Sequence, residues 1–249
     1  MMKWLLSIVI SITVSFSLNA QNYPLQVVST ERQLLQYQEN GQLKGPSAEI
    51  FQMLLAESGL RMSVDFMPWA RAFQIAESTP NTLIFSLIRN EQREDNFHWL
   101  LPVSQLIQTF VGKSAKITPT KYNLNDIQTK LTVVVRNTYG HQLLLESGFI
   151  ENENLYVVSS LEAALNLFFS DKVDFIFTEP NVVRANLAEH KLKATDLIMA
   201  PILQKSRRKS YIAINKQSDQ AIVELLKAGA EKVVQQPKYE QLFYQIGKK

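Results

Sequence analysis

The apolar positions of the chain recur in two rhythms that alternate along most of its length. Short runs dominated by apolar residues, or alternating apolar with polar ones, predict β-strands at 25–29, 62–66 and 82–86. Between them, apolar residues spaced three and four apart predict helices at 47–59 and 69–76. This order of strands and helices is typical of a βαβαβ unit, so we expect a mainly parallel sheet.

The same order returns in the second half of the chain. Further strands and helices are predicted at 131–136, 141–146, 154–158, 159–168, 173–178 and 180–189. Ser47 is expected to cap the first helix of the chain. Ser159 and Glu162 predict a capping box at the start of a later one. Two similar α/β units indicate two lobes.

The C-terminal part follows a different pattern. Strands are predicted at 197–203 and 211–215, around a basic loop at 205–209 that we interpret as solvated. An amphipathic helix is predicted at 218–234 and a last short helix at 239–246. Gly229 lies on the apolar stripe of the longer helix, where glycine costs about 1 kcal/mol relative to alanine.

The connections suggest how the two units are joined. Residues 108–114 form an apolar extended segment, and residues 115–130 form a polar connection. We expect the chain to cross between lobes near 108–113 and again near 208–212. The expected domains are a signal peptide at 1–20, lobe 1 at 21–109 and 210–249, and lobe 2 at 110–209.

The first 20 residues have the pattern of a secretory signal peptide. Lys3 supplies the positive start, an uncharged and largely apolar run follows, and Leu18-Asn19-Ala20 offers a cleavage site. The alternative is an uncleaved N-terminal anchor. The sequence predicts export to the periplasm of a Gram-negative bacterium.

Composition narrows the class of protein. The 249 residues are 46% hydrophobic and 20% charged, as in an ordinary globular protein. The small net charge of +3 gives no indication of a nucleic-acid partner. There is no cysteine, which excludes disulfides and a thiolate nucleophile. The sequence has no Gly-rich phosphate loop or G-x-S-x-G elbow, and its three histidines are scattered. We therefore expect no metal or cofactor.

Candidate binding residues lie where predicted strands end, because open α/β sheets bind ligands at the carboxyl ends of their strands. Arg93 follows the strand at 82–86, and its guanidinium could grip a carboxylate in two places or could pair with an acidic neighbour at the surface. Glu179 follows the strand at 173–178 and could accept a ligand ammonium or could favour a helix N-terminus. Trp69 could be a ligand platform or a core residue. From position alone, these alternatives stay open.

Several short segments resemble periplasmic solute-binding proteins of the polar amino acid type, bacterial extracellular solute-binding protein family 3. The segments are Gly41-Gln42-Leu43-Lys44-Gly45, Pro68-Trp69, Glu91-Gln92-Arg93, Arg136-Asn137-Thr138-Tyr139-Gly140 and Lys172-Val173-Asp174. Together they span nearly all of the chain after the signal peptide. The resemblance implies the two-lobed α/β periplasmic binding protein type II fold, each lobe a mainly parallel sheet flanked by helices, which closes on a small solute.

The resemblance also implies roles for individual residues. Arg93 and Ser86 would hold a ligand carboxylate, and Glu179 would hold its α-amino group. Thr138 and Tyr139 fall in a loop that contacts ligand at a helix N-terminus in the family, although the glycine usual there is missing.

Two departures from the family pattern concern the ligand. The stretch Arg32-Gln33-Leu34-Leu35 stands where the family has an aromatic platform. Trp69, Arg71 and Arg89 add aromatic and cationic groups. We therefore expect a ligand with more negative charge than a plain amino acid.

The predicted function is the binding of a small carboxylate-bearing solute, an amino acid or similar, for delivery to an ABC transporter permease. The protein is expected to be a monomer and not an enzyme. One alternative is a dehydratase-like exported enzyme on the same scaffold, with Glu179 or His141 as general acid. Another is a sensing protein that presents the ligand to a membrane receptor.

Overall fold

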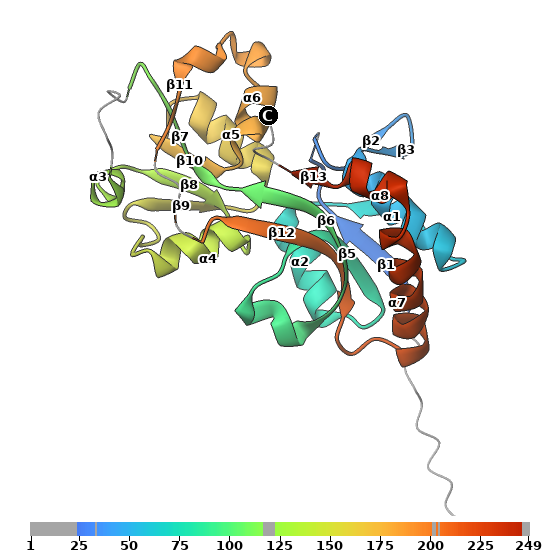
Figure 1. Cartoon of the computed structure of the whole chain (residues 1–249). Helices are drawn as coiled ribbons and strands as arrows, with labels where there is room; N and C mark the ends of the chain where they lie inside the picture. Colours follow the sequence, from blue (N-terminus) through green and yellow to red (C-terminus); the bar gives the residue numbers. More distant parts are fainter. Residues whose placement is uncertain (1–23, 33, 117–122, 201–202, 204, 246–249) are drawn as a thin grey trace, which may run out of the picture.

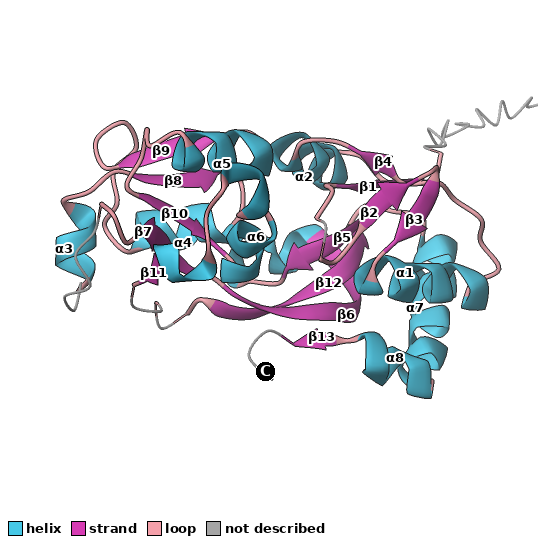
Figure 2. Cartoon of the chain, turned by 90° about the horizontal axis from the view of Figure 1, so that it is seen from above, coloured by secondary structure: helices cyan, strands magenta, loops and turns pink. Residues whose placement is uncertain are grey.

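The computed structural model contains two large β-sheets that lie side by side, each with its own helices, and a two-stranded hairpin (Figure 1; Figure 2). The predicted signal peptide lies outside the described residues. No helix within the described part of the chain is long and apolar enough to cross a membrane. The structure describes residues 24–32, 34–116, 123–200, 203 and 205–245.

The first sheet has six strands in the order β13-β6-β12-β5-β1-β4. β1 pairs in parallel with β4 and β5, whereas β12 runs antiparallel to both β5 and β6. The N-terminal βαβαβ unit is thus parallel, as predicted, and the C-terminal part of the chain inserts β12 beside it. The strands are β1 (Gln26–Ser29), β4 (Asp65–Phe66), β5 (Thr82–Ile88), β6 (Phe97–Ile107), β12 (Arg207–Asn215) and β13 (Tyr244–Gln245).

Helices cover both faces of this sheet. Neighbouring strand residues point to opposite faces: Val27 and Leu83 pack against α1 and α7, whereas Val28 and Ile84 pack against α2. A hairpin of β2 and β3 turns at Asn40-Gly41. We call this sheet with its helices and hairpin the first half. Its other elements are β2 (Tyr37–Glu39), β3 (Gln42–Lys44), α1 (Pro46–Glu57), α2 (Trp69–Ser78), α7 (Gln220–Val234) and α8 (Pro237–Leu242).

The second half is built on a five-stranded sheet in the order β11-β7-β10-β8-β9. β8, β9 and β10 are parallel, as predicted for the second βαβαβ unit, and β7 runs antiparallel to β10 and β11. Its elements are β7 (Thr109–Lys113), α3 (Leu124–Gln128), β8 (Thr132–Val135), α4 (Tyr139–Glu146), β9 (Leu155–Val158), α5 (Leu161–Phe169), β10 (Phe175–Thr178), α6 (Pro180–Ala185) and β11 (Leu197–Met199).

The chain crosses between the halves twice, at neighbouring points. Gln108 alone separates β6 from β7, and the return runs between β11 and β12. The Gln108 backbone N–H donates to the Ser206 carbonyl at 3.3 Å, so the two crossings lie side by side. The first crossing is shorter than expected, because β7 belongs wholly to the second sheet. The return lies before β12, which belongs wholly to the first sheet, and not near 208–212 as expected. The lobe boundaries at residues 109–110 and 209–210 stay a prediction.

Several predicted element ends are wrong. Helix α1 begins at Pro46 with Gly45 as N-cap, so Ser47 lies buried inside the helix. Ser160, not Ser159, caps α5 by accepting from the Ala163 backbone N–H. The last helix ends at Leu242 and gives way to β13. These errors are shifts of one or a few residues. Four elements were not predicted at all: strands β2, β3 and β6, and helix α3, which lies in the segment interpreted as a polar connection.

Gly229 lets α7 approach α1 closely. A Cβ at this position would collide with the Ser58 Oγ, which is buried without a hydrogen-bond partner, and would lie 3.3 Å from the Ser58 backbone nitrogen. Gly229→Ala should therefore lower the free energy of unfolding by about 1–3 kcal/mol, despite the better helix propensity of alanine. The loss should shrink in a Ser58→Ala background, measured by urea denaturation. Equal losses in both backgrounds would contradict this packing account.

Tyr239 fixes α8 to the sheet, because its hydroxyl donates to the Pro102 carbonyl at 2.9 Å. Burial raises the pKa of Tyr239 from 10.0 to about 12. The folded state therefore keeps a proton that the unfolded state loses, and this stabilisation is complete below about pH 10 and is lost as pH rises toward 12. Tyr239→Phe should be less stable by about 1 kcal/mol at pH 8. The difference should narrow by pH 11, when unfolding free energies of both proteins are compared; a constant difference would refute the titration.

Candidate ligand-binding site

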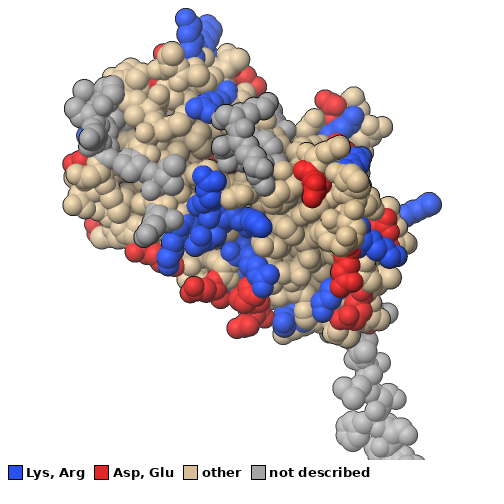
Figure 3. Space-filling model, viewed as in Figure 1, with Lys and Arg blue, Asp and Glu red and all other residues tan. Residues whose placement is uncertain are grey.

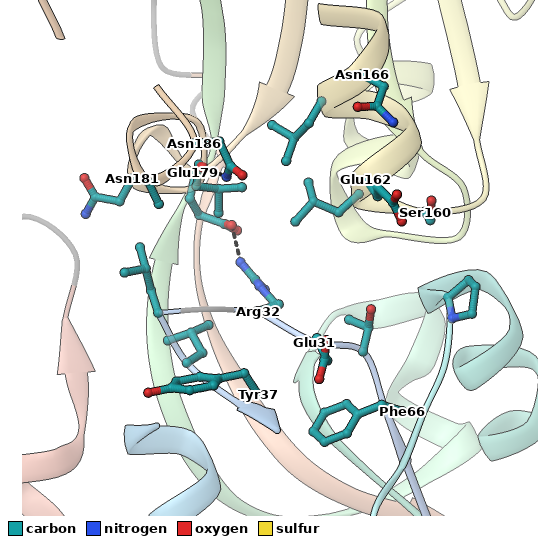
Figure 4. A pocket seen from close by; sticks show the side chains of 18 of the residues that line it. Glu31, Arg32, Tyr37, Phe66, Ser160, Glu162, Asn166, Glu179, Asn181 and Asn186 are labelled. Atoms are coloured by element: carbon teal, nitrogen blue, oxygen red, sulfur yellow. Dashed lines mark hydrogen bonds and ion pairs between the residues drawn. The ribbon is translucent and has the colours of Figure 1, made fainter. Parts of the chain in front are cut away.

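The two halves enclose a small cavity that opens toward a larger cleft. The inner cavity has a volume of about 80 Å³ and is lined by residues of both halves, among them Ser86 and Arg93 from the first and Thr138 and Glu179 from the second. The outer cleft has a volume of about 600 Å³ (Figure 4). Both spaces share Thr30, Arg32, Leu161 and Glu179 as lining residues.

Arg93 is the buried cation of the inner cavity. It lies on a short 3₁₀ helix, Glu91–Asn96, after β5, and its side chain is only 6% exposed. The guanidinium donates to the carbonyls of Ile88, at 3.1 Å, and Asn137, at 2.7 Å, and it lies 4.7 Å from the centre of the Phe73 ring. No carboxylate within the described residues pairs with it. Burial lowers the pKa of Arg93 to about 10, which reflects the cost of keeping a charge away from water.

Ser86 lies within β5, two residues before its end, and lines the inner cavity together with Arg93. It has a positive φ of 63°, a conformation that a non-glycine residue adopts only when its surroundings enforce it. Its hydroxyl donates to the Gln36 Oε1 at 2.8 Å, and Gln36 is fully buried. This backbone conformation falls where the register between β5 and β12 shifts, and the strand continues beyond it to Ile88. The Ser86 hydroxyl still has acceptor capacity.

Three side chains of the first half hold the second half by hydrogen bonds across the cavity. The Asn137 carbonyl accepts from the Trp69 indole N–H at 3.0 Å as well as from Arg93. Asn90, which accepts from the Arg93 backbone N–H, donates its amide to Gln142 on α4. Trp69 also packs on Phe73, so it serves as both core and cavity wall.

Thr138 and Tyr139 bring the start of α4 to the cavity. Thr138 caps the helix by accepting from the His141 backbone N–H, and its hydroxyl donates to the Val135 carbonyl. The Tyr139 hydroxyl donates to the Lys205 carbonyl at 2.9 Å, so its ring lines the cavity while its polar end faces the crossing segment. A Cβ on Gly140 would lie 3.1 Å from the Gln108 Oε1, which explains a glycine at this close approach.

Arg32 and Glu179 form an ion pair between the halves (Figure 4). Arg32 follows β1 and Glu179 follows β10, and their side chains are 16% and 4% exposed. Both residues line the inner cavity and the outer cleft, so the pair stands between the two spaces. The candidate acceptor for a ligand ammonium thus already has a cation beside it.

Gln108 was missed as a candidate. It lies at the first crossing between the halves, lines the inner cavity, and its Oε1 is buried without a hydrogen-bond partner. Buried amides are normally hydrogen-bonded, so an unpartnered one that faces a cavity is a candidate ligand contact. Its position on a strand crossing leaves no periodic or motif signal in the sequence.

Arg71 and Arg89 are not among the residues that line either space, so their role as ligand contacts stays a prediction without support from this geometry. Arg71 is exposed on α2. The Arg89 guanidinium pairs with Glu94 and lies 5.5 Å from the centre of the Trp99 ring, on the outer surface.

Basic side chains also gather over the start of β12, where Figure 3 shows a cluster of Lys and Arg on the face of the molecule. At the cavity itself, the positive charges that are shielded from water are those of Arg32 and Arg93.

The site has no metal-binding group and little acid–base capacity. The described residues contain no cluster of three His, Cys, Asp or Glu side chains that could hold a metal ion. His141 lies on α4, where its side chain is hydrogen-bonded to Glu151, and it does not line the inner cavity. Of the two candidate general acids, only Glu179 reaches the cavity.

Three solved structures with a similar fold are distant from this chain in sequence. A histidine kinase sensor domain with similarity to periplasmic binding proteins superposes with a TM-score of 0.73 at 16% identity, over 88% of this chain and 94% of that one. The arginine-, lysine-, histidine-binding protein ArtJ from Geobacillus stearothermophilus gives 0.72 at 17% identity, over 88% and 93%. An amino acid ABC transporter substrate-binding protein, AbpA from Streptococcus pneumoniae, bound to L-arginine, gives 0.70 at 16% identity, over 87% and 92%.

These similarities confirm the predicted fold class, an α/β periplasmic binding protein fold. No protein-family model matches the chain, and no curated protein matches it in sequence. At 16–17% identity the solved structures establish the fold and leave the ligand to be argued from the cavity.

The Trp69 bond across the cavity can be tested without a ligand. Trp69→Phe keeps a ring against Phe73 but removes the donor to Asn137, so the ratio of open to closed molecules should rise roughly two- to tenfold. Small-angle X-ray scattering should report a larger radius of gyration. Trp99→Phe is the matched control, because the Trp99 indole bonds to Glu94 within the first half. Equal scattering from both variants would contradict a role in closure.

Proposed function

We propose that this protein is a periplasmic solute-binding protein of the polar amino acid type, which holds a small carboxylate-bearing solute between its halves. The supporting observation is Arg93, a buried guanidinium that lines a cavity and has no carboxylate partner among the described residues. A ligand carboxylate would supply the missing negative charge, and charge-assisted hydrogen bonds of this kind contribute roughly 1.5–3 kcal/mol each.

The proposed binding step couples the ligand to closure. Residues 21–109 with 210–249 would move as one lobe and residues 110–209 as the other, hinged at the crossings beside Gln108. Arg93 and Ser86 would hold the carboxylate from the first lobe, while Thr138, Tyr139 and Glu179 would complete the site from the second. A ligand that contacts both lobes favours the closed state because only that state offers all the contacts.

Delivery to an ABC transporter permease is the proposed destination of the loaded, monomeric protein. AbpA is described as the substrate-binding protein of an amino acid ABC transporter. The predicted signal peptide at 1–20 would place the protein in the periplasm. The competing destination is a membrane receptor, since a histidine kinase sensor domain has the same fold.

We propose binding rather than catalysis. A dehydratase-like enzyme would need a general acid at the ligand, and the two candidates are otherwise engaged: Glu179 pairs with Arg32, and His141 bonds to Glu151 outside the cavity. Incubation of the purified protein with a bound acid, followed by mass spectrometry, tests this choice. Recovery of the unaltered acid supports binding, and conversion of the acid supports an enzyme.

Arg93 provides the decisive test of the carboxylate site. Arg93→Met keeps much of the side-chain volume and removes the charge, so affinity for a carboxylate ligand found by a thermal-shift screen should fall at least about a hundredfold. The empty protein should keep its melting temperature within a few degrees, because removal of a desolvated charge offsets the lost hydrogen bonds.

Arg89→Met is the matched control, since Arg89 lies outside the cavity. Calorimetric titration should give wild-type affinity for this control and a large loss for Arg93→Met. Undiminished binding by Arg93→Met would rule out the proposed site.

A further inference from the structure

The ion pair between Arg32 and Glu179 bears on which carboxylic acids the cavity accepts. Glu179 is 3% exposed as a whole residue, and the chain itself places a guanidinium against it (Figure 4). A ligand ammonium at this carboxylate would either share it with the Arg32 guanidinium, as a second cation beside it, or displace Arg32. The displaced guanidinium would then lie near a second cation with its own partner lost, a costly arrangement in a site shielded from water.

The charges that line the inner cavity do not cancel. Two guanidinium groups, of Arg32 and Arg93, face one carboxylate, of Glu179. The remaining polar side chains that line it are neutral: Thr30, Ser86, Gln108, Thr138, Tyr139 and Thr178. The cavity therefore carries one unbalanced positive charge, at Arg93, which matches a ligand with a single negative charge better than a zwitterion.

The glutamates of the outer cleft do not change this balance. Glu31, Glu162 and Glu189 line the outer cleft and are all exposed to solvent. Charges in water are screened over about 8–10 Å at physiological salt, whereas buried charges are screened much less. The buried groups of the inner cavity thus dominate the selection of a ligand held there.

Gln108 adds a neutral polar contact. Its amide has an unpartnered Oε1 and stands on the wall of the inner cavity, where it could accept from a hydroxyl or, through its N–H groups, donate to a carbonyl. The cavity volume of about 80 Å³ has room for about five to eight water molecules by the usual measure, so the ligand portion inside it is small.

We infer that the ligand is a small carboxylate without an ammonium group beside it, such as a hydroxy or oxo acid. Its carboxylate lies on Arg93, a neutral oxygen lies toward Gln108, and the Arg32–Glu179 pair stays intact. This inference rests on the proposed function, because it assumes that Arg93 binds a carboxylate.

Matched acids separate this inference from the proposed function. The probes are 2-hydroxy, 2-oxo, unsubstituted and 2-amino acids on three-, four- and five-carbon chains, with L-arginine added. The wild-type protein should bind a 2-hydroxy or 2-oxo acid at least about tenfold more tightly than the 2-amino acid of the same chain length, by calorimetric titration. Tighter binding of a 2-amino acid or of L-arginine would overturn the inference and leave the carboxylate site standing. Binding of none of these probes would overturn both.

Arg32→Gln tests the mechanism of selection. The substitution leaves Glu179 without its internal cation, so the preference should move toward the 2-amino acid by at least about tenfold. Arg32→Gln/Glu179→Gln lacks both charges and should again prefer the acid without an ammonium group. Arg71→Gln, an exposed arginine outside the cavity, is the control for loss of a cation. An unchanged preference in Arg32→Gln would refute the role given to the ion pair. If that variant fails to fold, the titrations of the wild-type protein with the matched acids still decide the inference.

Discussion

The structure depends on one constraint. The Arg93 guanidinium is kept away from water, and no carboxylate among the described residues pairs with it. Arg93 keeps its charge only because two backbone carbonyls and the face of Phe73 replace part of its hydration. One of those carbonyls, that of Asn137, belongs to the opposite half. The buried cation is therefore stabilised most fully when the halves are together, because only then does the Asn137 carbonyl accept from it.

The topology makes such an arrangement possible. Both crossings lie next to each other at Gln108 and Ser206, so the halves are joined along one edge and can separate at the other. The elements that face the cavity are strand ends and helix starts: the end of β5, the end of β10 and the start of α4. The sheets and helices already order the backbone of these segments. Ordering the site would therefore cost a ligand little binding free energy, because most of that conformational entropy is lost when the protein folds.

Sequence patterns predicted the helices and strands that depend on local periodicity. They did not predict contacts between residues that are far apart in the sequence. The two βαβαβ units, and the positions of Ser86, Arg93 and Glu179 at strand ends, follow from alternating apolar runs. Strand β6 was missed because Pro102 interrupts it, yet the structure accommodates the proline where the register with β12 shifts, opposite Tyr211. The sequence also does not show which way a cation after a strand points, and Arg89 turns outward to Glu94 and Trp99. Arg32 meets Glu179 across 147 positions of sequence, and no pattern encodes that pairing.

The partly exposed Arg32 and the buried Arg93 have different roles, the first in holding the halves together and the second in binding. Arg32 joins the halves through a carboxylate that the chain itself provides, so this contact favours the closed arrangement whether or not a ligand is present. A ligand shifts the balance only through interactions that differ between open and closed states. If it replaced Arg32 at Glu179, it would break one link between the halves in order to make another, and its net effect on closure would be small. A carboxylate on Arg93 adds a link without removing one, which is why an acid that leaves the ion pair alone is the more effective closing ligand.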